Sequence, residues 1–152
     1  MFKRMDRAQA DEIVRRLSAL KSDATPRWGT STATQILGHL TDTVRYTMGD
    51  GLDLPFKGSW KTRNVYKPLL INQIVPIPHN VRIPSRDGQP RRDAFRDGTL
   101  DELKWALDEY LRGVDAGKWG ERMHPFFGLL KPVQWRKFHC AHFEHHLTQF
   151  GV

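Results

Sequence analysis

Residues 132–149 read PVQWRKFHCAHFEHHLTQ, a run that opens with a proline. Proline is tolerated in the first turn of a helix, where its missing N–H would have had no intrahelical partner. With an advance of about 100° per residue, His142 and His146 lie one turn apart on one face, among aromatic neighbours, whereas Glu144 points away. This stretch therefore predicts a long helix that carries two imidazoles on its inner face.

Apolar residues at helical spacing predict three more helices upstream. They cover approximately residues 6–20, 32–46 and 99–116. Thr32 with Gln35, and Thr99 with Glu102, have the three-residue spacing of a capping box and mark two of the helix starts. No strand alternation rivals these segments, so we expect an all-α chain.

A long connection, residues 51–98, separates the second and third predicted helices and contains six of the nine prolines. Structureless connections of this length are uncommon and usually serve function or pack as an extended wrap. Part of it should be buried, because its middle is apolar at Leu69, Leu70, Ile71, Ile74, Val75 and Ile77. Four helices with one long crossover between the second and third predict an all-α four-helix bundle, in which cofactor sites are built from inward-facing side chains.

Length and composition favour one soluble domain that spans residues 1–152. Domains typically contain roughly 100 to 200 residues, and 39% hydrophobic with 27% charged residues is a globular composition. No apolar run approaches the roughly 18 residues of a membrane helix, so we expect a cytoplasmic protein without membrane contact. The single cysteine, Cys140, excludes an internal disulfide and any multi-cysteine metal site. Metal chemistry would therefore depend on histidines and carboxylates.

The net charge of +7 requires that nucleic-acid or anionic-surface binding be considered. Nine basic and three acidic residues lie between positions 57 and 97, so this stretch supplies most of the excess. A basic connection is weaker evidence for nucleic-acid binding than a basic stripe along a helix that reads a DNA groove. We expect a solvated basic loop, and an anion or nucleic-acid binder through residues 57–97 remains an alternative.

Histidines cluster near the carboxyl end: four of the seven lie between positions 139 and 146. Two imidazoles spaced like His142 and His146 can bind one metal ion. Alternatively, they are surface residues, or core residues that are satisfied by hydrogen bonds. Their aromatic face favours a shared ion, because a buried neutral imidazole needs a partner for each nitrogen.

A third ligand must come from elsewhere in the chain, and His39 is the candidate. It shares the inward side of the second predicted helix with Ile36 and Leu40. His79 and His124 lie in proline-bounded loops and are less easily aimed at the pair.

These stretches resemble a known superfamily. Residues 142–149 (HFEHHLTQ) resemble the last-helix His-x-x-x-His stretch of the DinB-like (DinB/YfiT) superfamily, and residues 35–40 (QILGHL) look like its second-helix ligand motif. Three other stretches look like an uncharacterised-domain (DUF) branch of that superfamily, namely 23–29 (DATPRWG), 124–128 (HPFFG) and 145–152 (HHLTQFGV). The likeness covers nearly the whole chain from Leu17 onward.

The resemblance implies a DinB-like four-helix bundle with a long connection between helices 2 and 3, frequent homodimerisation, and a divalent ion. The implied ion is zinc, nickel or iron, and its implied ligands are His39, His142 and His146. Superfamily members of known activity include transferases and isomerases that use low-molecular-weight thiols, and a hydrolase of cysteinylglycine-type substrates. This sequence departs from the superfamily pattern in two ways. It has two additional histidines, His139 and His145, and a basic connection.

Three neutral imidazoles would leave the ion an open position, as in catalytic sites. Zinc lowers the pKa of bound water to about 7, and a coordinating thiol loses its proton. The sequence thus predicts a metal-dependent transferase or hydrolase that activates a thiol or water and acts on a small molecule. An alternative from a different functional class is a non-catalytic binding or assembly module whose metal is structural or absent.

Several residues are candidates for roles around such an ion. His145 could hydrogen-bond at the pocket mouth or carry a proton, and His139 could line the pocket. Asp42, one turn beyond His39, is a possible hydrogen-bond partner for a ligand imidazole. If the basic connection folds over the metal face, its arginines could hold a substrate carboxylate or phosphate. These arginines are Arg82, Arg86, Arg91 and Arg92.

Overall fold

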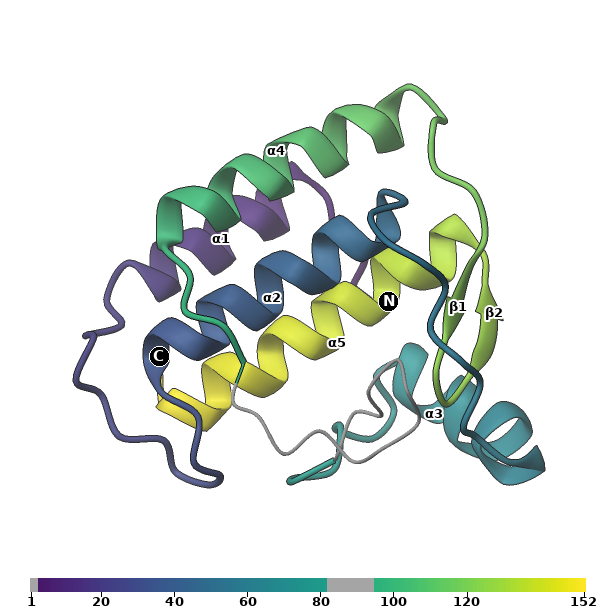
Figure 1. The fold of residues 1–152 in the computed structure, drawn as a ribbon, viewed down its shortest axis with the longest axis horizontal. Coiled ribbons are helices and arrows are strands. Elements are labelled where there is room, and N and C mark those ends of the chain that lie inside the picture. Colours follow the sequence, from purple (N-terminus) through teal and green to yellow (C-terminus); the bar gives the residue numbers. More distant parts are fainter. Residues whose placement is uncertain (1–2, 82–94) are drawn as a thin grey trace.

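The computed structural model describes residues 3–81 and 95–152. The elements in these ranges are α1 (Arg7–Leu17), α2 (Ala33–Thr47), a turn of π-helix η1 (Thr62–Tyr66), α3 (Lys67–Ile71), α4 (Leu100–Asp115), β1 (Arg122–His124), β2 (Gly128–Leu130) and α5 (Pro132–Phe150). Figure 1 shows the four longest helices side by side, with α3 and the two strands beyond one end of α5. Both α1 and α2 contact α4 and α5.

Local hydrogen bonds fix the helix ends where the sequence predicts them. The Thr32 side chain accepts the N–H of Gln35, whose side chain accepts the N–H of Thr32. Thr99 and Glu102 form the same capping box at the start of α4. Helix α5 has Pro132 in its first turn and is capped at its carboxyl end by Gly151, whose positive φ of 73° suits glycine. The predicted helix starts at Thr32, Thr99 and Pro132 are therefore confirmed.

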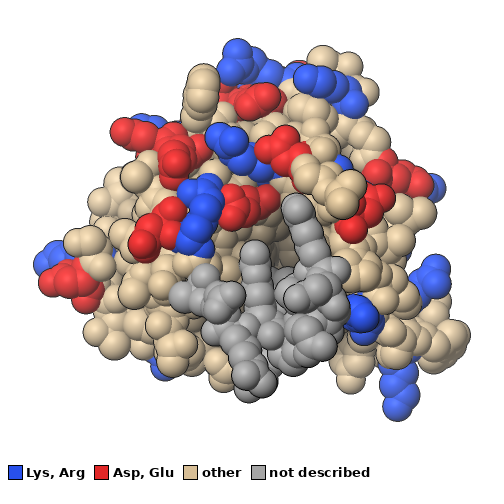
Figure 2. Space-filling model, in the orientation of Figure 1, with Lys and Arg blue, Asp and Glu red and all other residues tan. Residues whose placement is uncertain are grey.

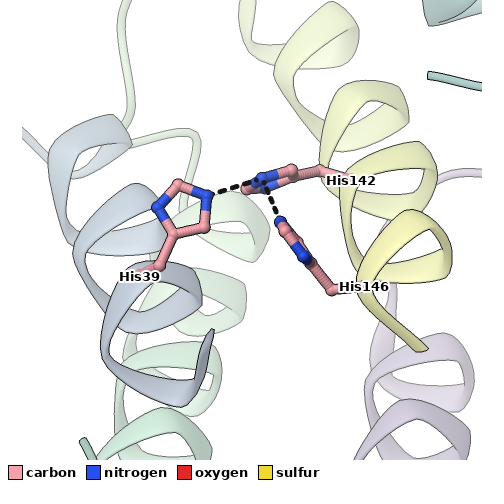
Figure 3. Close-up of side chains that lie close together, drawn as sticks. All are labelled: His39, His142 and His146. Carbon is pink, nitrogen blue, oxygen red and sulfur yellow. Dashed lines mark hydrogen bonds between the residues drawn. The ribbon is translucent and has the colours of Figure 1, made fainter. Parts of the chain in front are cut away.

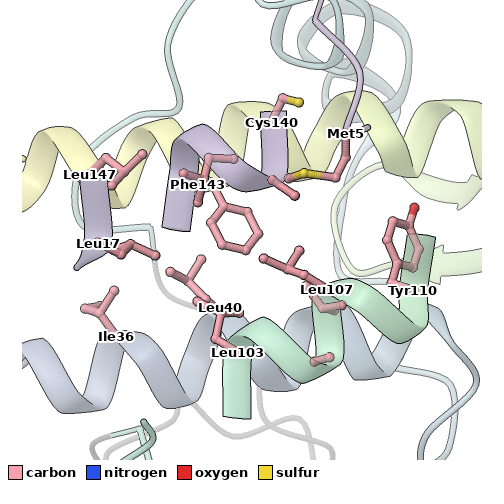
Figure 4. Packing of buried hydrophobic residues seen from close by; sticks show 14 of the residues in the cluster. Met5, Leu17, Ile36, Leu40, Leu103, Leu107, Tyr110, Cys140, Phe143 and Leu147 are labelled. Atoms are coloured by element: carbon pink, nitrogen blue, oxygen red, sulfur yellow. The ribbon is translucent and has the colours of Figure 1, made fainter. Parts of the chain in front are cut away.

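The main core lies between α1, α2, α4 and α5 (Figure 4). Leu40, Leu103, Phe143 and Leu147 have no exposed surface. Full burial of a large apolar side chain contributes about 1.5–3 kcal/mol, so this cluster supplies much of the stability. Cys140 belongs to the same core.

A second apolar cluster lies at the other side of α5, where the strands and α3 pack. Its buried members are Leu70, Ile71, Phe127, Leu130, Trp135 and Phe138. The strands pair antiparallel, with Met123 opposite Leu129 and His124 opposite Gly128. The sequence predicts no strands here, because three-residue strands are too short to show a period of two. Helix α5 is thus apolar on two sides and joins both clusters.

The connection between α2 and α4 is only partly as predicted. It contains η1 and α3, and Leu70 and Ile71 are buried. The prediction that part of the connection is buried is confirmed, although Ile74 and Val75 are 60% and 37% exposed. They follow the end of α3, beyond the residues that pack on α5. Arg82, Arg86, Arg91 and Arg92 lie outside the described residues.

The described surface mixes the two signs of charge. Acidic and basic side chains are interleaved on the face in Figure 2, and Arg96 pairs with both Asp42 and Glu102. None of the helices in the described ranges has the length and apolar character that a membrane span requires.

Candidate metal centre

Three histidines from two helices converge on one point (Figure 3). The Nε2 atom of His142 lies 2.9 Å from Nε2 of His39 and 3.2 Å from Nε2 of His146. One ligand nitrogen from each ring lies within 4.8 Å of the others, and all three residues are buried. The structure therefore brings His39 of α2 together with the predicted pair of α5.

Gln149 fixes the orientation of His146. Its side-chain amide donates to the carbonyl oxygen of Trp28 at 2.9 Å, which leaves its Oε1 atom 2.8 Å from Nδ1 of His146. Since an amide oxygen can only accept, Nδ1 of His146 must donate the N–H. In the neutral ring, the lone pair is then on Nε2, the atom that faces the other two imidazoles.

Aromatic rings cover the faces of the other two imidazoles. His39 stacks on Phe95, with ring centroids 4.0 Å apart, and His142 stacks on Phe138 at 5.2 Å. Phe95 belongs to a segment that crosses α2 closely at Gly38, where a Cβ would overlap the carbonyl oxygen of Arg96. The missing side chain at position 38 thus lets this segment approach the helix beside His39.

Burial keeps the two imidazoles of α5, His142 and His146, neutral at pH 7. It lowers the pKa of His146 to about 4, although the hydrogen bond to Gln149 opposes the shift. The pKa of His142 is well below its ordinary value, first because of burial and then because of the neighbouring His146 and His39. Neutral imidazoles offer lone pairs, which is the form that binds a metal ion.

The donor set fits a divalent ion. The Nε2 atom of His146 presents a lone pair to the other two rings, because this imidazole already uses its N–H on Gln149. Nδ1 of His142 is buried and has no hydrogen-bond partner within the described ranges. Imidazole nitrogens suit zinc, nickel, copper and iron. His39, His142 and His146 would hold the ion through their Nε2 atoms.

The other predicted residues fall in different places. His145 lines the cleft next to the three histidines, and its ring lies 5.5 Å from Trp28 and 6.1 Å from His79. His139 does not line the cleft: it is fully buried, its Nε2 lies 3.1 Å from the Thr47 hydroxyl, and Tyr110 packs against its ring. His139 instead faces Thr47 at the end of α2 and Tyr110 of α4.

Asp42, which the sequence offers as a hydrogen-bond partner for a ligand imidazole, pairs with Arg96 instead. Its carboxylate lies 2.8 Å from the Arg96 guanidinium, which holds it at the surface.

The three histidines open onto a cleft of about 2050 Å³ between α2, α5 and the segments around the strands. Its walls near the cluster are largely aromatic and include Tyr46, Phe127, Trp135 and Phe138. His124 also lines the cleft, although the sequence places it in a proline-bounded loop that is hard to aim. The pairing of β1 with β2 turns this loop toward α5. Local sequence spacing therefore does not predict that His124 faces the cleft.

One family model matches nearly the entire chain. It is described as "Protein of unknown function (DUF1569)" and matches residues 2–151. No curated protein and no solved structure matches the chain.

Proposed function

The chain belongs to the DUF1569 family, and from this premise we propose that it is a divalent-metal-binding protein that activates a thiol or water in a transfer or hydrolysis reaction. The observation that carries the proposal is the convergence of three buried imidazoles at the wall of a large cleft. Structural zinc sites are usually closed by four protein ligands, whereas catalytic sites keep an open position. The described donors number three, which favours catalysis over a purely structural role.

A bound ion of this kind would lower the pKa of water or of a thiol, so that either becomes a nucleophile at neutral pH. The protein contributes the arrangement around it. Gln149 orients His146, while Phe95 and Phe138 hold the other two rings and keep bulk water from their faces. His145 borders the cleft and is placed to contact a bound small molecule.

The proposal extends to the fold family. The order of α1, α2, α4 and α5, the long segment after α2 and the origin of the histidines in α2 and α5 support a DinB-like four-helix bundle. That relationship would make zinc, nickel or iron the ion and a low-molecular-weight thiol the co-substrate. It would also make the protein a homodimer, which light scattering on the purified protein tests.

Metal analysis tests the proposal directly. Protein expressed in medium supplemented with zinc, nickel and iron should contain about one equivalent of a divalent metal, and His146→Ala should lose most of it. His79→Ala is the matched control, because His79 packs near His145 but lies outside the cluster. Metal-free wild-type protein, or an unchanged metal content in His146→Ala with its helical circular dichroism intact, would remove the proposed function.

A further inference from the structure

The cleft contains a second polar group that the metal cluster does not use. We propose that His124 binds a carbonyl oxygen of the small-molecule substrate through its Nε2–H. The inference rests on the proposed function, because it assigns one substrate contact in the same cleft. It names the substrate class as a small molecule with a carbonyl group and an apolar portion.

The hairpin turn dictates which nitrogen of His124 carries the proton. Nδ1 accepts the backbone N–H groups of Phe126 and Phe127, each at 3.2 Å. A nitrogen that accepts hydrogen bonds is unprotonated, so the neutral ring must have its hydrogen on Nε2. Burial, with a smaller contribution from Lys67, lowers the pKa of His124 to about 3. The ring is therefore a neutral donor throughout the physiological range.

Packing leaves only Nε2 free to bind a ligand. Phe127 stacks on the ring with centroids 4.3 Å apart, and Phe138 meets it edge-on at 4.7 Å. Nε2 has no hydrogen-bond partner within the described ranges, yet it is not among their fully buried unpartnered atoms. Since His124 lines the cleft, Nε2 is the side-chain polar atom that this residue can offer to a molecule bound there. The turn and the two phenylalanines hold this donor in a fixed direction.

Phe138 connects this donor to the metal cluster. Its ring centroid lies 4.7 Å from that of His124 and 5.2 Å from that of His142. The two imidazoles are thus separated by no more than the sum of these distances. A small molecule whose reacting atom is at the three histidines can place an apolar portion over Phe138 and a hydrogen-bond acceptor at His124.

The chemistry around His124 selects a neutral acceptor. Its ring neighbours are Phe126, Phe127, Trp135 and Phe138. The nearby Lys67 ammonium is engaged by the Leu129 carbonyl oxygen at 3.4 Å. A carboxylate would lose its hydration here for one neutral donor, whereas a carbonyl oxygen loses less and gains the same hydrogen bond. Ketones, amides and esters therefore fit better than free acids.

Two substitutions separate binding from a purely structural role in the turn. His124→Asn places an amide oxygen near the position of Nδ1, where it can still accept the two backbone N–H groups, but it removes the Nε2–H. His124→Gln places an amide N–H near the position of Nε2 but gives up the acceptor for the turn. If His124 only stabilises the turn, His124→Gln should have a lower thermal midpoint and His124→Asn should not. Substrate binding predicts that His124→Asn loses affinity while retaining its thermal midpoint.

The test uses acetophenone as the carbonyl probe and ethylbenzene as its oxygen-free analogue. Long-range ¹H–¹⁵N spectra of the full chain, recorded with and without zinc, report the protonation of both His124 nitrogens. We expect the Nε2–H tautomer, and an Nε2 shift that acetophenone produces and ethylbenzene does not. The acetophenone Kd should rise about fivefold in His124→Asn, the loss of one neutral hydrogen bond, and stay within about twofold of wild type in His124→Gln.

The outcomes separate this inference from the proposed function. Any of three results would overturn the role of His124. They are a proton on Nδ1, an Nε2 resonance that does not shift when acetophenone is added, and an acetophenone Kd that is equal in His124→Asn and wild type. If zinc binds and any of these results is found, only the present inference fails. If His124 responds as expected but the protein holds no metal, the donor assignment stands and the metal-dependent function fails.

Discussion

Gln149 determines which nitrogen of His146 faces the other two imidazoles. Its amide group is committed to the Trp28 carbonyl, so its oxygen receives the Nδ1–H of His146. Groups that orient a ligand imidazole in this way typically account for 10- to 100-fold in metal affinity. Gln149 lies one turn of α5 beyond the pair, where helical spacing alone cannot distinguish such a partner from an ordinary buried amide.

Replacing Gln149 tests this positioning role. Gln149→Met has a similar length but accepts only weakly, so the metal Kd should rise by about 10- to 100-fold. Gln149→Glu retains the acceptor and should bind metal within about threefold of wild type, a difference worth less than 1 kcal/mol. Competition with a chromophoric chelator measures both values. A wild-type Kd in Gln149→Met would show that His146 needs no such partner.

At the residue scale, sequence spacing predicts which way side chains on regular helices point, but it does not do so for residues outside them. His142 and His146 are one turn apart, and the inward face of the second helix identifies His39, so a 3.6-residue period suffices for all three. Spacing alone leaves open whether His139 lines the cleft, and the structure places it against Thr47 and Tyr110 instead. His124 is missed because its direction depends on a two-strand pairing.

At the scale of elements, the capping boxes of α2 and α4 are predictable because each involves residues three apart. The short strands β1 and β2 are not, since they are stabilised by contacts with α3 and α5 that are distant in sequence. Helix α3 lies in a proline-rich connection without a sustained period and gives little local signal. Sequence analysis therefore finds the long helices and misses the elements that shape the far end of the cleft.

The crossing of the 95–98 segment over α2 gives a prediction at this scale. Gly38→Ala would push its methyl group into the Arg96 carbonyl oxygen, and the backbone at Gly98 is also in contact there. Such overpacking typically costs about 1–3 kcal/mol. Urea unfolding should show this loss, whereas Gly120→Ala, where a Cβ meets nothing within 4 Å, should change stability little. Equal stability of the two variants would contradict this close crossing.

At the scale of the whole molecule, buried neutral histidines make stability depend on pH. Burial lowers the pKa of both His124 and His139 from 6.5 to about 3. As the pH falls below 6.5, the unfolded chain binds protons that the folded chain does not. Each group then removes about 1.4 kcal/mol of unfolding free energy per pH unit until the pH approaches its folded pKa. Above pH 6.5 neither contributes a slope.

Urea unfolding of chelator-treated protein between pH 7 and pH 5 measures this dependence. His139→Leu should retain most of the stability at pH 7, because it removes a buried Nδ1 that has no partner in the described part of the chain. Its slope between pH 6 and pH 5 should be smaller than that of wild type by about 1.4 kcal/mol per pH unit. Identical slopes would show that His139 is protonated in the folded protein or exposed to water.

The central claim is that one divalent ion is held by three imidazoles that α2 and α5 bring together, and zinc-edge X-ray absorption tests it most directly. Cys140 lies in the main core and is not part of the histidine cluster, so sulfur should be absent from the zinc neighbours. Wild-type protein with one equivalent of zinc should show scattering from three imidazoles, and His146→Ala from two. Sulfur among the neighbours, or the same number of imidazoles in both proteins, would contradict the account.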